Sequence, residues 1–146
     1  MIAGIGTDIV AIARMARLLA RHGDAGVAKI LSTEELAGFH DNFGKFEADK
    51  EDASLPAEAQ RKQHRAAAYL AKRFAAKEAL SKAFGTGLRE PLTLTAITVR
   101  NDDYGKPSFV YTTALAAWIE AKNLTAHLSI SDERDYAVAF VILEKA

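Results

Sequence analysis

The chain has 146 residues, 49% of them hydrophobic and 26% charged, which is typical of one globular domain with a real core. Lysine plus arginine equals aspartate plus glutamate at 19 each, so net charge does not indicate nucleic acid as a partner. The lack of cysteine excludes disulfides, thiolate metal sites and cysteine nucleophiles. Without a basic leader or a run of about 18 apolar residues, we expect a cytoplasmic protein that does not contact a membrane.

The N-terminal stretch places an acid among apolar residues. Residues 2–7 contain two glycines and are expected to form a short buried strand whose backbone passes close to another element. A helix is expected from about Ile9 to His22, ended by Gly23. Asp8 lies between the two, and a carboxylate is costly to desolvate unless it is paired or binds a metal. Asp8 therefore needs a partner.

Three arginines follow in the first expected helix. Arg14, Arg17 and Arg21 stand at i, i+3 and i+7, which makes a basic stripe about two turns long. Such a stripe is either a solvated helix face or a docking surface for an acidic helix, since opposite charges steer encounter and fix register.

The next segments are a capped helix and a polar stretch. Ser32 and Glu35 have the spacing of a capping box, which predicts a helix from Ser32 to about Asn42. Residues 44–63 contain only Phe46 and Leu55 as large apolar residues, so we expect a flexible surface insert, with Pro56 as the possible start of a helical extension.

A long helix is predicted over residues 65–84, because strong helix formers fill nearly every position and Gly85-Thr86-Gly87 follows. Leu70, Phe74 and Ser81 share its core-facing line. Glu78 and Lys82 stand one turn apart on a face otherwise made of alanines. That pair is either an ordinary i,i+4 surface pair or a carboxylate and an ammonium at a site that a ligand approaches closely.

The C-terminal part has the pattern of strands. Residues 92–99 and 107–112 predict a hairpin, residues 113–122 a helix, and residues 126–131 and 135–144 two final strands. His127 shares a polar strand face with serines, which is as typical of a structural residue as of a catalytic one. The last strand is apolar on both faces, so it is either central in a covered sheet or buried between subunits, and we favour an oligomer.

Four motifs in order resemble one enzyme family. The stretches GIGTDIV at 4–10, FAAKEALSKAFGTG at 74–87, NDDYGKP at 101–107 and HLSISDERDYA at 127–137 are similar to the signature segments of holo-acyl-carrier-protein synthases, the small phosphopantetheinyl transferases. The resemblance covers almost the whole chain apart from the 44–63 insert. It implies an α+β fold, with one compact domain over 1–146, an antiparallel sheet packed against a long helix, and a homotrimer whose active sites lie at subunit boundaries.

The resemblance also implies a reaction and its residues. The expected activity is transfer of 4′-phosphopantetheine from coenzyme A to a serine of acyl carrier protein, releasing adenosine 3′,5′-bisphosphate, as in fatty acid biosynthesis. Asp8 and Glu78 would hold Mg²⁺, Lys82 would assist catalysis, and Arg14, Arg17 and Arg21 would receive the carrier protein. The residues expected beside coenzyme A are Phe74, Lys77, Lys82, Gly85, Thr86, Gly105, Lys106, Pro107 and His127.

Two positions depart from the family pattern. Some members have an aspartate, proposed as the general base, where Ala37 stands here. Glu34 or Glu35 could substitute, and a water on the metal is a further alternative. Many relatives have a histidine where Asp132 stands, which puts any role of that position in doubt. The sequence leaves open whether the carrier protein belongs to fatty acid or to polyketide synthesis. The alternative function is a non-catalytic oligomeric module that binds a nucleotide or an acidic helix.

Overall fold

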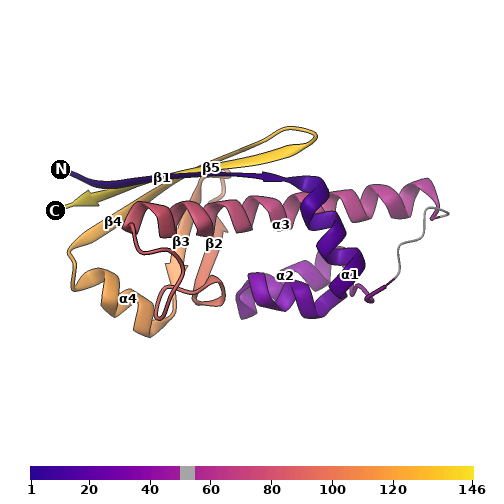
Figure 1. The fold of residues 1–146 in the computed structure, drawn as a ribbon, viewed down its shortest axis with the longest axis horizontal. Helices are drawn as coiled ribbons and strands as arrows, with labels where there is room; N and C mark the ends of the chain where they lie inside the picture. Colours follow the sequence, from indigo (N-terminus) through magenta and orange to yellow (C-terminus); the bar gives the residue numbers. More distant parts are fainter. Residues whose placement is uncertain (50–54) are drawn as a thin grey trace.

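The computed structural model describes residues 1–49 and 55–146, and the long helix α3 (Ala57–Phe84) runs along most of its length (Figure 1). The helix predicted over residues 65–84 is confirmed, and it has an N-terminal extension that begins at Ala57, directly after Pro56. The other elements are β1 (Ile2–Ala11), α1 (Ile12–Ile30), α2 (Thr33–Phe43), the 3-10 turn η1 (Leu94–Ala96), β2 (Ile97–Asn101), β3 (Pro107–Tyr111), α4 (Thr113–Glu120), β4 (Leu124–Asp132) and β5 (Tyr136–Lys145).

One sheet covers a side of α3. Strands β1, β5 and β4 form it in that order, both pairs antiparallel, and the C-terminal strand β5 is central. On the other side of α3 lie α1, α2, α4 and the separate β2–β3 hairpin (Figure 1). The predicted α+β fold, an antiparallel sheet packed against a long helix, is therefore confirmed. Within the described residues no helix is long and apolar enough to cross a membrane.

Strand β1 is longer than the sequence indicated. It pairs with β5 as far as Ala11, and α1 begins only at Ile12, so the expectation of a helix from Ile9 is wrong. Residues of a strand alternate between its faces. Asp8 consequently shares with Gly6 and Val10 the face that points to α3, while Ile9 faces outward.

Two glycines allow β1 to lie directly against α3. A Cβ added at Gly4 would stand 2.1 Å from the carbonyl oxygen of Ala83, and one at Gly6 would stand 2.0 Å from that of Ala79. Real Cβ atoms do not approach oxygen so closely, so only glycine fits at this contact. The expectation of a backbone passing close to another element is confirmed.

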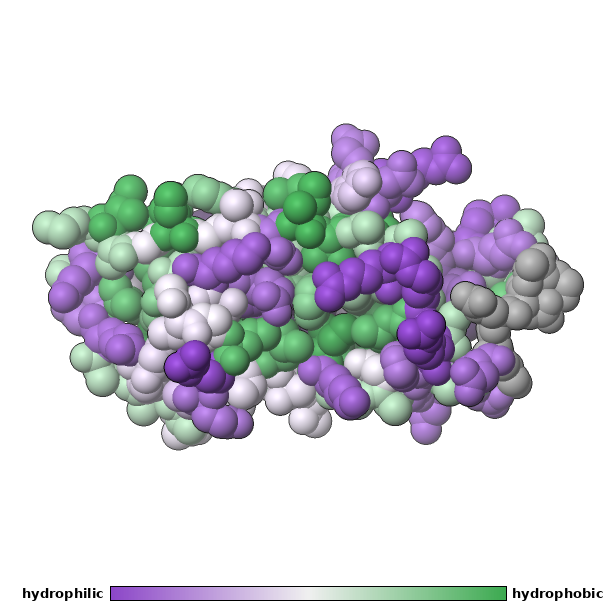
Figure 2. All heavy atoms as spheres, viewed as in Figure 1, coloured by the Kyte–Doolittle hydropathy of each residue, from purple (hydrophilic) through white to green (hydrophobic). Residues whose placement is uncertain are grey.

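The outward face of the sheet is apolar and exposed. Ile5 and Ile9 of β1 are 61% and 62% exposed, and Val138 and Phe140 of β5 are 37% and 42% exposed. Figure 2 shows hydrophobic side chains gathered along the edge of the molecule where β1 and β5 lie. The last strand is thus central in the sheet, and the described residues of a single chain leave its second face exposed.

Helix α1 contains a sharp turn. Gly23 has φ 54° and ψ −142°, and the chain then resumes a helix to Ile30 instead of ending at His22. The start of the predicted insert packs on this turn, since the Phe46 amide donates to Asp24 Oδ1 over 2.9 Å and Phe46 lies against Phe39. Within the expected insert, residues 57–63 belong to α3, as the possible helical extension from Pro56 predicted, whereas residues 44–49 are irregular. Residues 50–54 lie outside the described residues.

The predicted hairpin is shorter than expected. Residues 94–96 form the 3-10 turn η1, and pairing begins only at Ile97. Strand β4 carries His127 on its exposed face with the serines, as its alternation predicted.

We expect Gly6→Ala to destabilise the fold by about 1–3 kcal/mol, because the added methyl group has no space beside Ala79. Urea unfolding measures this change. Gly38→Ala in α2 is the matched control, since nothing lies within 4 Å of its added Cβ, and it should stabilise by up to about 1 kcal/mol. Equal effects at the two glycines would contradict the close packing of β1 on α3.

Candidate active site

Asp8 and Lys82 form an ion pair between β1 and α3. The distance from Lys82 Nζ to Asp8 Oδ1 is 2.9 Å, and the same ammonium donates to the Thr7 carbonyl oxygen over 3.0 Å. The Asp8 side chain is 16% exposed and that of Lys82 is 52% exposed. The prediction that Asp8 needs a partner is confirmed, and the partner lies 74 residues away in the sequence.

Glu78 stands one helical turn before Lys82 and shares its electrostatic environment. Desolvation raises the pKa of Glu78 above its ordinary value of 4.5, the negative charge of Asp8 raises it further, and the positive charges of Lys82 and Arg14 oppose both effects. A carboxyl group whose ionisation is disfavoured by burial and by a nearby carboxylate attracts a cation. We call Asp8, Glu78 and Lys82 the carboxylate cluster.

The carboxylate cluster fits a hard divalent ion. Mg²⁺ takes oxygen ligands and usually keeps only one or two protein carboxylates, with phosphate oxygens and waters completing its shell. Asp8 and Glu78 supply two such groups, and the described residues contain no set of three His, Cys, Asp or Glu side chains arranged to hold a metal. The donor set therefore suits an ion shared with a phosphate better than one held by protein alone.

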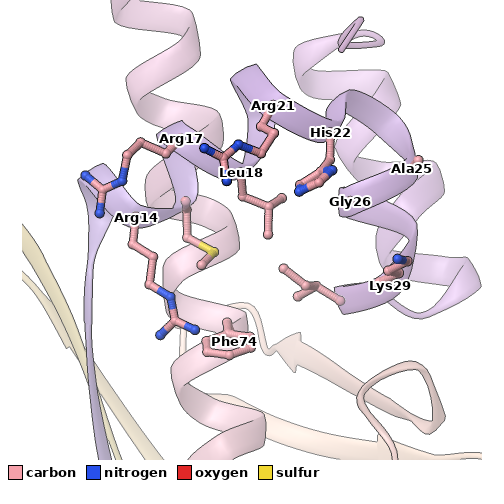
Figure 3. Close-up of a pocket in the computed structure, with 11 residues that line it drawn as sticks. Arg14, Arg17, Leu18, Arg21, His22, Ala25, Gly26, Lys29 and Phe74 are labelled. Atoms are coloured by element: carbon pink, nitrogen blue, oxygen red, sulfur yellow. The ribbon is translucent and has the colours of Figure 1, made fainter. Parts of the chain in front are cut away.

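A basic groove of about 450 Å³ lies between α1 and α3 (Figure 3). Arg14, Arg17 and Arg21 all line it, and the guanidinium of Arg14 lies 5.1 Å from the ring centroid of Phe74. The remaining lining residues are Met15, Leu18, His22, Ala25, Gly26, Lys29 and Ile30. The groove thus has an apolar floor and a positively charged rim.

Sequence reasoning missed His22 and Lys29 as lining residues. The turn at Gly23 directs the second half of α1 back toward the first, which adds both residues to the rim. Gly26 permits this, since a Cβ there would stand 2.8 Å from Leu18 Cδ2 and 2.9 Å from the Cβ of His22. Gly26, three residues after Gly23, was the only feature of the sequence that indicated this close return of the chain.

The groove and the carboxylate cluster adjoin. Phe74, Glu78 and Lys82 stand at i, i+4 and i+8, so they follow one another along the same side of α3. Arg14 contacts Phe74 in the groove and also acts electrostatically on Glu78. An acidic partner seated in the groove would therefore lie next to the two carboxylates.

Lys77 does not belong to this surface. Its side chain is fully buried, and its ammonium donates to Glu35 Oε1 over 2.6 Å and to the carbonyl oxygens of Ile30 and Leu94. Burial lowers the pKa of Lys77, and Glu35 opposes that shift. All three of its protons are used inside the chain, so the prediction that Lys77 lies beside a nucleotide is wrong for this arrangement.

The two acids considered as general bases are also occupied. Glu35 is 3% exposed and bound to Lys77, whereas Glu34 accepts from Arg100 Nε over 2.8 Å and from Nη2 over 2.6 Å. The pKa of Glu34 is lowered by its hydrogen bond to Arg100. Neither carboxylate faces the carboxylate cluster with a free oxygen, because each is bound to a cation on another element.

The other residues expected at coenzyme A lie in three places. Gly85 ends α3 with φ 76°, one turn beyond Lys82, and Thr86 beside it is exposed. Gly105, Lys106 and Pro107 lie at the turn of the separate β2–β3 hairpin. His127 is on the outward face of the sheet, opposite to the face that carries Asp8. Within one chain, His127 is therefore separated from the carboxylate cluster by the sheet.

Comparison with known proteins gives one consistent relationship. The family model described as the 4′-phosphopantetheinyl transferase superfamily matches residues 4–141. The holo-[acyl-carrier-protein] synthase of Dechloromonas aromatica is 51% identical over 146 residues, 100% of both chains. That of Aromatoleum aromaticum is 47% identical over 145 residues, 99% of both chains. The similarity thus extends over the whole chain rather than over isolated motifs.

Solved structures agree with the sequence comparison. The holo-[acyl-carrier-protein] synthase of Neisseria meningitidis has a TM-score of 0.80 and 42% identity, and the alignment covers 99% of this chain and 100% of that one. A Bacillus anthracis holo-(acyl-carrier-protein) synthase in complex with coenzyme A (3′,5′-ADP) has a TM-score of 0.72 and 34% identity, with 100% and 99% covered.

Replacing Glu78 by glutamine should stabilise the chain at neutral pH in the absence of divalent metal. The pKa of Glu78 is raised in the folded state. The contribution of Glu78 to folding stability is therefore present below its ordinary pKa of 4.5 and is lost as pH rises through its pKa in the folded state. The melting temperature of Glu78→Gln should therefore exceed that of the wild type near pH 7, with the difference vanishing below about pH 4.5.

Glu133→Gln, in the exposed β4–β5 turn, is the control for loss of one negative charge. A gain in melting temperature at Glu78→Gln that stays the same across this pH range would show that ionisation of Glu78 is not its cause.

Proposed function

The chain belongs to the 4′-phosphopantetheinyl transferase superfamily, and we propose that it transfers 4′-phosphopantetheine from coenzyme A to a serine of an acyl carrier protein. The observation that carries the proposal is the junction of the basic groove with the carboxylate cluster through Arg14. One surface offers positive charge to an acidic protein, and the adjoining surface offers carboxylates and an ammonium to phosphate chemistry. The relatives named above act on acyl carrier protein, and the Bacillus anthracis structure contains coenzyme A.

The reaction requires no nucleophile from this chain. The serine oxygen of the carrier protein attacks the β-phosphorus of coenzyme A, a new O–P bond forms, and the bridging P–O bond to adenosine 3′,5′-bisphosphate breaks. The hydroxyl proton goes to a base, and the bisphosphate leaves with the bond's electron pair. What the chain must provide is alignment of the two substrates and compensation of negative charge, which are the main terms in phosphoryl transfer.

Asp8 and Glu78 are the residues that would hold Mg²⁺. Their fit rests on the position of Asp8 beside Lys82, one turn from Glu78 on α3, and on the raised pKa of Glu78, to which burial and the negative charge of Asp8 contribute. A bound Mg²⁺ supplies Lewis-acid compensation of charge on the pyrophosphate. Lys82 already neutralises Asp8 from one side, and its half-exposed ammonium can turn to a phosphate oxygen of the leaving bisphosphate.

The basic rim of the groove is proposed to receive the carrier protein. Arg14, Arg17 and Arg21 line the groove, and Lys29 extends its rim beyond the turn at Gly23 (Figure 3). Acyl carrier proteins are acidic, so opposite charges would steer their approach and set the register of the serine against Glu78. Fatty acid biosynthesis in the cytoplasm is the proposed setting.

A homotrimer would complete the coenzyme A site. The exposed apolar face formed by Ile5, Ile9, Val138 and Phe140 needs a cover. His127 lies on that same outward face, so a second copy packed there would bring its own residues toward the edge of the sheet that holds Asp8. The hairpin residues Gly105, Lys106 and Pro107 would then contribute to the nucleotide site with the end of α3.

Asp8→Asn should abolish transfer while leaving the fold intact, because the amide can neither balance Lys82 nor bind a hard cation well. The assay is incubation with coenzyme A, Mg²⁺ and apo carrier protein, followed by the mass gain of one phosphopantetheine group on the carrier. Mg²⁺ should raise the melting temperature of the wild type and not that of Asp8→Asn. Wild-type turnover in the variant would refute the metal assignment.

Arg21→Glu should raise the KM for carrier protein about 5- to 50-fold with little change in the KM for coenzyme A, since the groove meets only the acidic partner. Arg61→Glu, on the exposed first turns of α3, makes the same change in net charge away from the groove and should leave both constants near the wild type. If the two reversals behaved alike, total charge rather than the groove would govern association.

A further inference from the structure

Beneath the groove lies a buried ion pair that the proposed reaction does not use. Lys77 of α3 and Glu35 of α2 are 0% and 3% exposed, and the distance from Lys77 Nζ to Glu35 Oε1 is 2.6 Å. Replacing a buried ion pair by apolar residues of similar volume is often neutral or stabilising. The demands of stability alone therefore do not account for two ionisable side chains at the centre of this core.

Lys77 joins the ends of three elements. Its ammonium donates to the carbonyl oxygen of Ile30 over 2.8 Å and to that of Leu94 over 2.9 Å, in addition to Glu35. Ile30 ends α1 and lines the basic groove, and Leu94 begins η1 just before the β2–β3 hairpin. One side chain of α3 thus binds the end of the groove helix and the base of the hairpin.

Glu35 completes the connection from the opposite side. Its Oε1 accepts the Ser32 amide over 2.9 Å in the capping box of α2, and its Oε2 accepts the Val99 amide of β2 over 2.9 Å. Arg73 Nε lies 3.3 Å from Oε2, and its guanidinium carbon stands 3.6 Å from the ring centroid of Tyr69. The carboxylate is therefore held by α2, α3 and β2 together.

The elements joined here carry the three parts of the proposed site. Helix α1 carries the basic rim, α3 carries Glu78 directly after Lys77, and the hairpin carries the turn at Gly105 and Lys106. Hydrogen bonds in a low-dielectric interior are strong and directional, so a buried network of them fixes relative positions more sharply than apolar contacts do. Such a network sets the positions of α2 and β2 relative to α3, with which each makes few other contacts.

We propose that the Lys77–Glu35 pair acts as a positioning device, which holds the carrier-binding groove and the nucleotide hairpin at the spacing from Glu78 that transfer requires. The proposal rests on the proposed function, since spacing matters only if a serine in the groove must reach a phosphorus at the carboxylate cluster. Neither residue touches substrate. Their effect passes through Ile30, Leu94 and Val99 to the surfaces that do.

The decisive measurement separates turnover from stability. Lys77→Met keeps the length of the side chain and removes its donors, and Glu35→Gln keeps the shape and removes the charge. Both should lower kcat about 10- to 100-fold at a temperature where circular dichroism shows each variant folded, as expected when reacting groups are misaligned by a fraction of an ångström. The KM for carrier protein and the KM for coenzyme A should both rise, because the lost contacts hold Ile30 in the groove and Leu94 and Val99 at the hairpin.

Leu115→Ala in α4 is the matched control. Leu115 is fully buried and belongs to none of the joined elements, so its truncation should lower the melting temperature while leaving kcat within about twofold of the wild type. The double variant Lys77→Met/Glu35→Leu should recover part of the melting temperature lost in Lys77→Met without recovering kcat.

Each result decides between distinct conclusions. Wild-type kcat in folded Glu35→Gln, or parallel recovery of kcat and melting temperature in the double variant, would overturn positioning and leave the pair a purely structural one. If Lys77→Met does not fold, Glu35→Gln alone decides. Failure of the wild-type chain to add phosphopantetheine to apo carrier protein would overturn the proposed function, and the positioning proposal with it.

Discussion

The contact between the glycines of β1 and the carbonyl oxygens of α3 is the constraint on which the candidate site depends. Gly4 and Gly6 lie so close to Ala83 and Ala79 that no side chain could intervene. Two residues after Gly6, strand alternation returns Asp8 to the same face, where it meets Lys82 at 2.9 Å. The ion pair is thus a consequence of backbone packing, which places the N-terminal strand directly against α3, a helix from the middle of the sequence.

The carboxylate cluster destabilises the fold, and the proposed function accounts for its presence. Asp8 and desolvation both raise the pKa of Glu78, so two acids are held where the fold alone would prefer fewer negative charges. Lys82 and Arg14 compensate only in part. Functional sites commonly keep such destabilising groups because a ligand compensates their charge when it binds, and the ligand proposed here is a divalent cation with a phosphate.

Charged residues of α3 have two roles, one in the core and one at the proposed site. Lys77 and Glu35 are buried and fully hydrogen-bonded, and they connect α1, α2, α3 and the hairpin internally. Glu78, the next residue of α3 after Lys77, and Lys82 one turn beyond Glu78 remain accessible to a ligand. Adjacent residues of one helix therefore serve the core and the proposed chemistry, because successive side chains of a helix point about 100° apart.

Much of the local structure follows from the sequence by itself. The capping box at Ser32 and Glu35, the end of α3 at Gly85 and the alternation of β4 obey short-range rules of hydrogen bonding and backbone geometry, and all three are present in the structure. The four motifs likewise indicated the family and singled out Asp8 and Glu78, and helical spacing singled out the three arginines of the basic stripe. These features depend only on neighbours within a few residues or on the order of motifs.

Tertiary structure alone decided what each side chain meets. The helical angle of Lys77, about 100° from Glu78, was available from the sequence, but only the packing of α1, α2 and η1 made that direction the core rather than a nucleotide site. The turn at Gly23 brought Lys29 to the groove, and pairing with β5 kept Asp8 in a strand. Periodicity gives the direction of a side chain, whereas its partner is set by elements that are distant in sequence.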